Sequence, residues 1–209
     1  MKIFGARYVC RTVTSWRFLA ILAFATHVPE SASAHVESGA LGGFQSGFIH
    51  PIIGIDHFLA MLAVGIWGAQ MGGRNVWTLP VTFPLIMAAG GILGMSSFAL
   101  QYVELGIALS VLILGLAIAF AWQAPEWAVL LLISVFAIFH GYAHGVELPR
   151  AVDPASYAIG FVVATGVIHI AGISIGYILG RPWKGRLSRA LGGLIAAAGL
   201  YFASVPLLA

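Results

Sequence analysis

Residues 127–147 read WAVLLLISVFAIFHGYAHGVE, and this stretch decides how the rest of the chain can fold. It is apolar up to Phe139 except for one serine, and then carries His140, His144 and Glu147. Because a helix turns about 100° per residue, His144 lies about 40° and Glu147 about 20° from His140. Two imidazoles and one carboxylate therefore share one stripe of a membrane-length helix, where ionisable groups are costly and tend to be functional.

The composition of the chain is that of a membrane protein. Of its 209 residues, 60% are hydrophobic and 8% are charged, with a mean hydropathy of +0.99, whereas soluble domains carry about 25% charged residues. The apolar runs are continuous rather than alternating, which predicts an all-α membrane protein and not a barrel. The sequence carries neither a nucleotide-binding fingerprint nor a basic patch with interleaved aromatics, so ATP hydrolysis and nucleic-acid binding are not indicated.

The N-terminal segment has the pattern of a secretory signal. Basic residues precede a short apolar stretch over residues 18–25, and Ala32-Ser33-Ala34 offers a small-residue cleavage site. We predict a cleavable signal peptide over residues 1–34 and a single membrane domain over 35–209; the alternative, an uncleaved first span, is disfavoured by the short apolar core. Cleavage would leave His35 as the N-terminus, either as a chelating amine and imidazole or as an exposed tail.

About six apolar segments follow, each long enough to cross about 30 Å of hydrocarbon. They lie at about residues 48–70, 76–98, 102–122, 126–147, 157–179 and 187–207. Proline is tolerated in a first helical turn, so the first helix is expected to begin at His50 or Pro51. The second segment is expected to be interrupted by Pro80, Pro84 and a pair of glycines, whereas the third holds little but apolar residues.

Basic residues set the orientation. Arg74 lies between the first two segments, and a basic cluster between the last two consists of Arg181, Lys184, Arg186 and Arg189. With six spans both loops fall on one side, which the positive-inside rule makes cytoplasmic, with Arg150 as the exception on the other face. The mature N-terminus is then outside, in agreement with a cleaved export signal.

A second polar set, His50, Asp56 and His57, lies in the first segment. The first segment enters from the outside and the fourth exits there, so both polar sets occupy the outer half of the bilayer at matching depths. His50 and His57 share a face if the helix between them is regular. Asp56 points about 100° away from His57, either as a ligand from the flank or as the acceptor that orients a histidine ring. We predict that the two sets converge on one divalent metal ion.

Neutral imidazole and carboxylate suit nickel, cobalt, zinc and iron, and residue types alone do not separate nickel from cobalt, zinc or copper. Cys10 falls in the signal segment, so the mature chain offers no thiolate. The alternative is a proton relay or an ion-pair network without metal; against it, no intramembrane Lys or Arg is available to pair with Asp56. His169, midway along the fifth segment with Thr165 one turn earlier, is either a packing residue or a deeper metal ligand.

Written out, the first polar set reads His50-Pro51-x-x-Gly54-x-Asp56-His57-x-Leu59-Ala60-Met61, and the second reads Phe139-His140-Gly141-x-Ala143-His144-Gly145-x-Glu147. The pair of motifs resembles the two signatures of the HupE/UreJ family, bacterial membrane proteins associated with hydrogenase and urease systems and regarded as secondary nickel permeases. The resemblance covers essentially the whole mature chain. It implies a metal path through His50, Asp56, His57, His140, His144 and Glu147; His35 and His169 lie outside the motifs.

The sequence thus predicts a secondary transporter, not an enzyme, that moves Ni(II) from the periplasm to the cytoplasm across a bacterial inner membrane. The lipid bilayer and the metal are its expected partners, together with maturation proteins of a hydrogenase or urease. One alternative is an intramembrane zinc enzyme, although a separate general base or nucleophile is missing from the pattern. Another is a metal- or haem-binding scaffold that serves metalloenzyme maturation.

Overall fold

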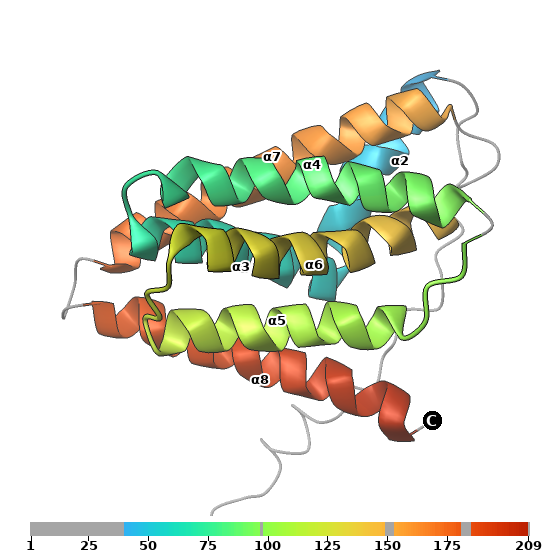
Figure 1. The fold of residues 1–209 in the computed structure, drawn as a ribbon. Coiled ribbons are helices and arrows are strands. Elements are labelled where there is room, and N and C mark those ends of the chain that lie inside the picture. The colour runs from blue at the N-terminus through green and yellow to red at the C-terminus, as the bar shows by residue number, and fades with distance from the viewer. Residues whose placement is uncertain (1–39, 97, 149–152, 181–184, 209) are drawn as a thin grey trace, which may run out of the picture. The chain divides into compact units, whose positions relative to one another are not determined.

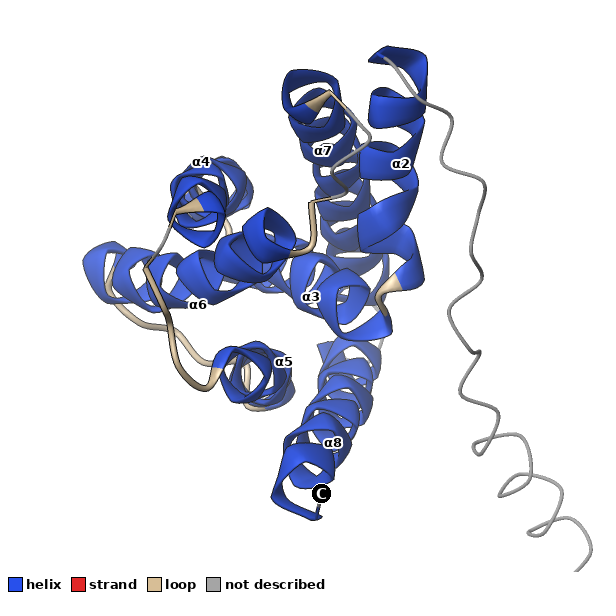
Figure 2. Ribbon diagram, turned by 90° about the vertical axis from the view of Figure 1, so that its right-hand side faces the viewer, coloured by secondary structure: helices blue, strands red, loops and turns tan. Residues whose placement is uncertain are grey.

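A computed structural model describes residues 40–96, 98–148, 153–180 and 185–208 (Figure 1). The predicted signal peptide and His35 lie outside the described residues. Every regular element in the described part is a helix, which confirms the all-α prediction (Figure 2). The helices are α2 (Ala40–Ile53), α3 (Ile55–Met71), α4 (Asn75–Met95), α5 (Val103–Ala119), α6 (Glu126–Val146), α7 (Pro154–Gly180) and α8 (Arg186–Leu208).

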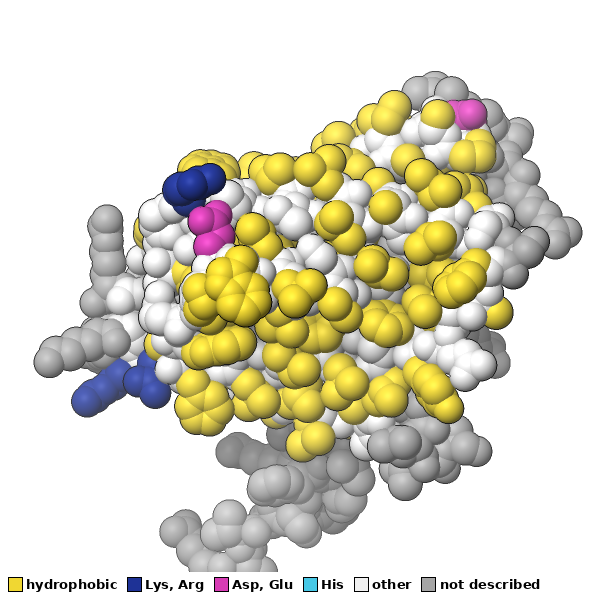
Figure 3. All heavy atoms as spheres, in the orientation of Figure 1, with side chains coloured by type: hydrophobic (Ala, Val, Ile, Leu, Met, Phe, Trp, Pro, Cys, Tyr) yellow, Lys and Arg dark blue, Asp and Glu magenta, His cyan; other side chains and the backbone are white. Residues whose placement is uncertain are grey.

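By length and composition, four of the described helices could each cross a membrane, and a fifth crossing is added if α2 and α3 count as one span. α4, α6, α7 and α8 are each long and apolar enough to cross a bilayer, and α2 and α3 pass the same test together as a bent pair. α5 is apolar as well, but its 17 residues make it shorter than the four helices that could each cross a bilayer. Hydrophobic side chains cover the face shown in Figure 3, and the visible Lys and Arg side chains gather at one end of it. The protein is therefore a helical membrane protein.

The first predicted span is not one regular helix. The expectation that it begins at His50 or Pro51 is wrong, because α2 runs through both residues and ends at Ile53. Gly54, with an extended ψ of 97°, breaks the helix, and α3 continues at an angle of 80° to α2. His50 and His57 consequently belong to different helices, and regular helical spacing no longer relates them.

The second predicted span is more regular than its sequence indicates. α4 runs without a break from Asn75 to Met95 although it contains Pro80 and Pro84. Pro84 has no N–H to give to the carbonyl of Pro80, four residues earlier. The ring of His169 on α7 meets that carbonyl instead, with its Nδ1 atom 3.0 Å from the Pro80 oxygen. A tertiary contact thus replaces the missing helical hydrogen bond.

α6 packs closely against α4 through glycines on both helices. A Cβ atom on Gly141 would collide with the carbonyl of Met87, and one on Gly145 would collide with that of Gly91. Gly94 of α4 meets α6 in the same way, against the carbonyl of Tyr142. Small residues let helix backbones approach and gain dispersion contacts in a membrane. This contact fixes which side of α6 faces α4, and hence where its histidines point.

α3 is the central helix of the described part of the chain (Figure 2). It packs against α4, α5, α7 and α8, and its fully buried side chains include Met61, Ile66 and Trp67. The Trp67 indole donates a hydrogen bond of 3.1 Å to the carbonyl of Trp122. Among the described helices, α3 and α6 are not a closely packed pair. Imidazole rings lie in the space between these two helices.

Candidate metal site

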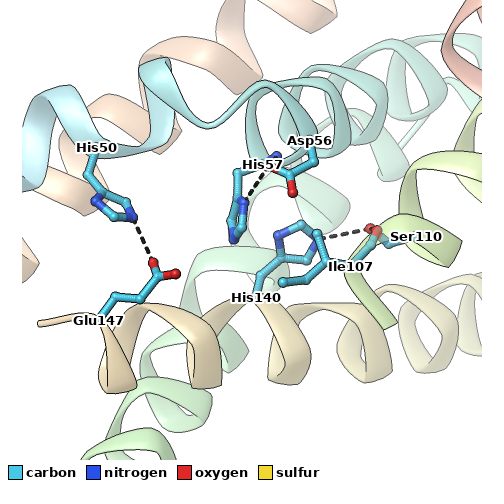
Figure 4. Close-up of polar contacts among 7 residues, drawn as sticks. All are labelled: His50, Asp56, His57, Ile107, Ser110, His140 and Glu147. Carbon is cyan, nitrogen blue, oxygen red and sulfur yellow. Dashed lines mark hydrogen bonds and ion pairs between the residues drawn. The ribbon is translucent and has the colours of Figure 1, made fainter. Parts of the chain in front are cut away.

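The two predicted polar sets meet where three helices end or begin. His50 lies in the last turn of α2, Asp56 and His57 lie in the first turn of α3, and Glu147 caps the C-terminus of α6. Figure 4 shows His50 of α2 directed at Glu147, and His57 of α3 directed at His140 of α6. The bend at Gly54 makes this possible, because it lets α2 and α3 approach α6 from two directions.

The outer part of the site consists of His50, His144 and Glu147. The Nε2 atom of His50 lies 3.2 Å from an Oε atom of Glu147. One ligand atom from each of the three residues lies within 4.8 Å of the others, a spacing that a single ion can bridge. His50 and Glu147 are partly exposed, with 34% and 50% of their side-chain surface accessible, whereas His144 is buried. This part of the site is therefore open at one side.

The inner part of the site consists of the rings of His57, His140 and His144. The ring centroid of His57 lies 4.6 Å from that of His140 and 4.4 Å from that of His144. All three side chains are buried. His144 also contacts His50, at a centroid distance of 4.9 Å, so it links the outer and inner parts. The predicted residues thus form an elongated group rather than one compact shell.

Asp56 orients the ring of His57. The Nδ1 atom of His57 lies 2.8 Å from Oδ1 of Asp56. A carboxylate only accepts hydrogen bonds, so Nδ1 carries the proton and donates it. Nε2 of His57 then holds a free lone pair, and this buried atom has no hydrogen-bond partner among the described residues. Of the two roles open to Asp56 from the sequence, the geometry matches that of orienting acceptor.

Ser110 of α5 performs the same task for His140. Its hydroxyl donates to the carbonyl of Ile107 at 2.6 Å, and its oxygen lies 2.8 Å from Nε2 of His140. Because the single hydroxyl proton is already given to Ile107, the serine oxygen accepts from His140 Nε2–H. The free lone pair of His140 is on Nδ1, which is buried and unpartnered within the described part. Sequence reasoning missed Ser110, since a serine in an apolar helix carries no local signal.

Glu104 is a second residue that the sequence reasoning missed. It lies in the first turn of α5, at the same end as the site, close enough for the carboxylates of Asp56 and Glu147 to act on it. The third predicted span holds little but apolar residues, as expected, and nothing in its sequence singles out Glu104 and Ser110. Their proximity to the site depends on how α5 packs, which no local pattern reveals.

Helix dipoles add to the negative potential at the site. His50 and His144 lie in the last turns of α2 and α6, so the partly negative carbonyl ends of both helices face this region. The positive N-terminal end of α3 is offset by Asp56 in its first turn. The lone-pair nitrogens, the carboxylates of Asp56, Glu104 and Glu147 and the two helix C-termini together favour a bound cation over an anion.

An apolar groove of about 260 Å³ runs beside the site between α4, α6 and α7. His144 forms part of its wall, and so do Met87, Tyr157 and Phe161. Both ring nitrogens of His144 are buried without a hydrogen-bond partner among the described residues.

Two further predicted residues are not part of this group. His35 lies outside the described residues. His169 of α7 is separated from the group by Phe83, whose ring centroid lies 5.5 Å from that of His140 and 5.8 Å from that of His169. The structure thus places His169 deeper than the six motif residues and behind an aromatic ring.

Fold and site together define a small helical membrane protein with a histidine and carboxylate group at one end of its helices. The sequence profile described as HupE / UreJ protein matches residues 22–202. The chain therefore belongs to the HupE/UreJ family, which confirms the resemblance of the motifs. Protein HupE of Rhizobium leguminosarum bv. viciae is 40% identical over 172 residues, which cover 82% of this chain and 90% of that protein. The comparison with solved structures found no match.

Proposed function

We propose that this protein is a secondary transporter that carries Ni(II) from the periplasm to the cytoplasm. Membership of the HupE/UreJ family and the name of the Rhizobium relative support a metal-related membrane role. The donor set supports nickel over magnesium or calcium, because these two ions prefer oxygen ligands. Cobalt, zinc and copper share the ligand preferences of nickel and are the competing ions.

The observation that carries the proposal is the hydrogen bonding of the buried imidazoles. His57 gives one ring proton to Asp56, and His140 gives one to Ser110. Each ring is left with a lone pair on a buried nitrogen that has no hydrogen-bond partner among the described residues. Metal-binding histidines usually have this arrangement, in which an acceptor fixes one nitrogen and the metal takes the other. Imidazoles that only filled space would gain nothing from unpaired nitrogens, because a buried polar atom without a partner destabilises the fold.

The proposed topology has six crossings, with α2 and α3 forming the first and α5 the third. Arg74, Arg186 and Arg189 lie at the helix ends opposite the site, and positive residues favour the cytoplasmic side. The site then opens to the periplasm of a bacterial inner membrane, in agreement with an N-terminal signal peptide over residues 1–34. Hydrogenase or urease maturation proteins are the proposed recipients of the metal.

The proposed mechanism follows from the order of the ligands. The exposed pair His50 and Glu147 captures the hydrated ion together with His144. The ion then exchanges remaining water for the nitrogens of His57 and His140, one to two turns deeper. Several weak sites in sequence allow both capture and release, and protonation of an imidazole would assist release, because only the neutral ring binds metal.

Uptake of nickel-63 into cells that lack other nickel permeases tests the proposal. Cells with the wild-type protein should accumulate the isotope, and His140→Ala, His144→Ala and Asp56→Ala should reduce uptake to the level of cells without the protein. Gly166→Ala is the matched control, because a Cβ atom at Gly166 meets nothing within 4 Å. Wild-type rates in all three site variants, at equal protein levels in the membrane, would refute the proposal.

A further inference from the structure

His169 is held in the same way as His57 and His140 of the six-residue site, which is called the outer group below because it lies nearer the end of the helices. Its Nδ1 atom lies 3.0 Å from the carbonyl oxygen of Pro80, and a carbonyl can only accept, so Nδ1 carries the proton. The carbonyl is available because Pro84, four residues later, has no N–H. Pro84 therefore fixes the tautomer of a histidine on another helix. The lone pair of His169 is on Nε2.

This lone pair has no hydrogen-bond partner among the described residues. His169 is 1% exposed, and its Nε2 atom is buried and unpartnered within the described part of the chain. Thr165, which is fully buried, stands one helical turn earlier, and its hydroxyl oxygen is likewise unpartnered there. Residues four apart on a helix are neighbours, with Cβ atoms about 6 Å apart. An imidazole nitrogen and a hydroxyl oxygen thus lie unsatisfied on adjacent turns in the interior.

These two residues continue a row that begins at the outer site. Tyr157, Phe161, Thr165 and His169 follow one another at intervals of four residues along α7. The Tyr157 ring contacts His50 at a centroid distance of 6.0 Å, and the Phe161 ring contacts His144 at 4.2 Å. His169 lies eight residues beyond Phe161, which is about 12 Å further along the helix at about 1.5 Å per residue. α7 therefore leads from the outer group to His169.

Phe83 keeps the two regions apart. Its ring is fully buried and meets His140 and His169 edge-on. An aromatic ring offers no strong ligand atom, so an ion must pass it rather than rest on it. The interior thus contains one group with many donors, then an apolar barrier, then a pair with two donors.

We propose that Nε2 of His169 and the hydroxyl of Thr165 form a second, inner binding station for a divalent transition-metal ion. This inference rests on the proposed transport function and adds a step to it. Two protein donors bind more weakly than the outer group, and the remaining coordination positions are filled by water. A weaker site behind the barrier gives the ion a place to stop without holding it, as conduction through successive sites requires.

Nickel binding to the purified full-length protein tests the inner station separately from transport. In a His144→Ala background the outer group is impaired, and a weakly bound part of the remaining nickel should depend on His169. Adding His169→Ala should remove that nickel. Thr165→Val, which keeps the side-chain volume, should weaken it by about three- to tenfold, whereas Thr165→Ser should restore it because the hydroxyl is retained. The binding of cobalt(II), followed by its visible absorption, gives the same comparison through ligand geometry.

The outcomes separate the two proposals. Equal nickel binding by His144→Ala and by the His144→Ala/His169→Ala double variant would overturn the inner station, and so would a His144→Ala/Thr165→Val variant that binds nickel like His144→Ala. Less bound nickel in the double variant than in His144→Ala supports the inner station. If wild-type cells accumulate no nickel-63 while this difference in binding persists, the transport proposal fails and the inner station stands as a metal site.

Discussion

Two adjacent faces of α6 differ in their effect on stability: one packs against α4 and the other carries the buried histidines. On one face, Gly141 and Gly145 bring the backbone of α6 against α4. On the other, His140 and His144 place imidazoles in the interior with ring nitrogens that have no partner among the described residues. Close packing of small residues stabilises a membrane bundle, whereas each unsatisfied buried polar atom destabilises it by about 1–3 kcal/mol. The glycine face holds the fold together, and the histidine face is maintained at the expense of stability.

This difference explains why glycine and histidine alternate in the motif of α6. The residue that follows each histidine, Gly141 or Gly145, lies against a backbone carbonyl of α4 and must therefore be small. The backbone contact then determines the rotation of α6 about its axis, and that rotation aims the histidines at α3. Substitutions on the two faces should therefore separate stability from metal binding.

The largest expected effect is on the glycine face. Gly141→Ala should lower the free energy of unfolding by about 1–3 kcal/mol, because the added methyl group meets the Met87 backbone carbonyl, which cannot rotate away. Thermal unfolding of the purified protein in detergent measures the loss. Gly166→Ala adds the same group where nothing lies within 4 Å and should unfold like wild type. Equal stability of the two variants would show that the contact between α4 and α6 is looser than described.

The next effect is on the histidine face. Asp56→Ala removes the carboxylate that fixes His57, and should lower nickel affinity by about 10- to 100-fold, as losses of such orienting acceptors do. Unfolding temperature should change little, since Asp56 is partly exposed, with 29% of its side-chain surface accessible. Asp56→Asn keeps an acceptor oxygen and should lose less affinity than Asp56→Ala. A stability loss larger than the affinity loss would contradict the division between the two faces.

Ser110→Ala tests the histidine face with a smaller expected loss of nickel affinity. It leaves His140 Nε2–H without its acceptor, so the ring is free to change tautomer, and nickel affinity should fall by about three- to tenfold, below the loss for a carboxylate. Ser134→Ala is the matched control, because Ser134 also donates to a backbone carbonyl of its own helix, that of Leu130, at 2.6 Å. It should bind nickel like wild type, and an equal loss in both variants would mean that helix packing rather than ring orientation sets the affinity.

The sequence predicted those parts of the molecule that depend on helical periodicity. The stripe of His140, His144 and Glu147 and the apolar segments follow from spacing alone, and the matching of the two polar sets follows from counting crossings. The bend at Gly54 was missed because Pro51 offered an equally good helix start. The partners of the histidines were missed because they depend on tertiary packing. Ser110 lies in the apolar stretch of α5 that follows Glu104, and the Pro80 carbonyl is available only because Pro84 lacks a donor.

The smallest expected effect lies outside both faces, at Asp153 before the first turn of α7. Its carboxylate accepts a hydrogen bond of 2.8 Å from the backbone N–H of Ser156, and this bond holds the pKa of Asp153 below its ordinary value of 3.8. A group whose pKa is lower in the folded state stabilises the fold above its unfolded pKa, and that contribution disappears as the pH falls through the folded value.

Asp153→Asn keeps an acceptor for the cap but cannot titrate. The unfolding temperature of wild type should therefore approach that of Asp153→Asn between about pH 5 and pH 3, while nickel affinity near neutral pH stays equal in both proteins. Asp153 is fully exposed, so solvent screens its charge and the difference should be small. A nickel affinity that changed with this substitution would mean that the start of α7 controls the metal site, and the loss of affinity on the histidine face could then no longer be assigned to ring orientation alone.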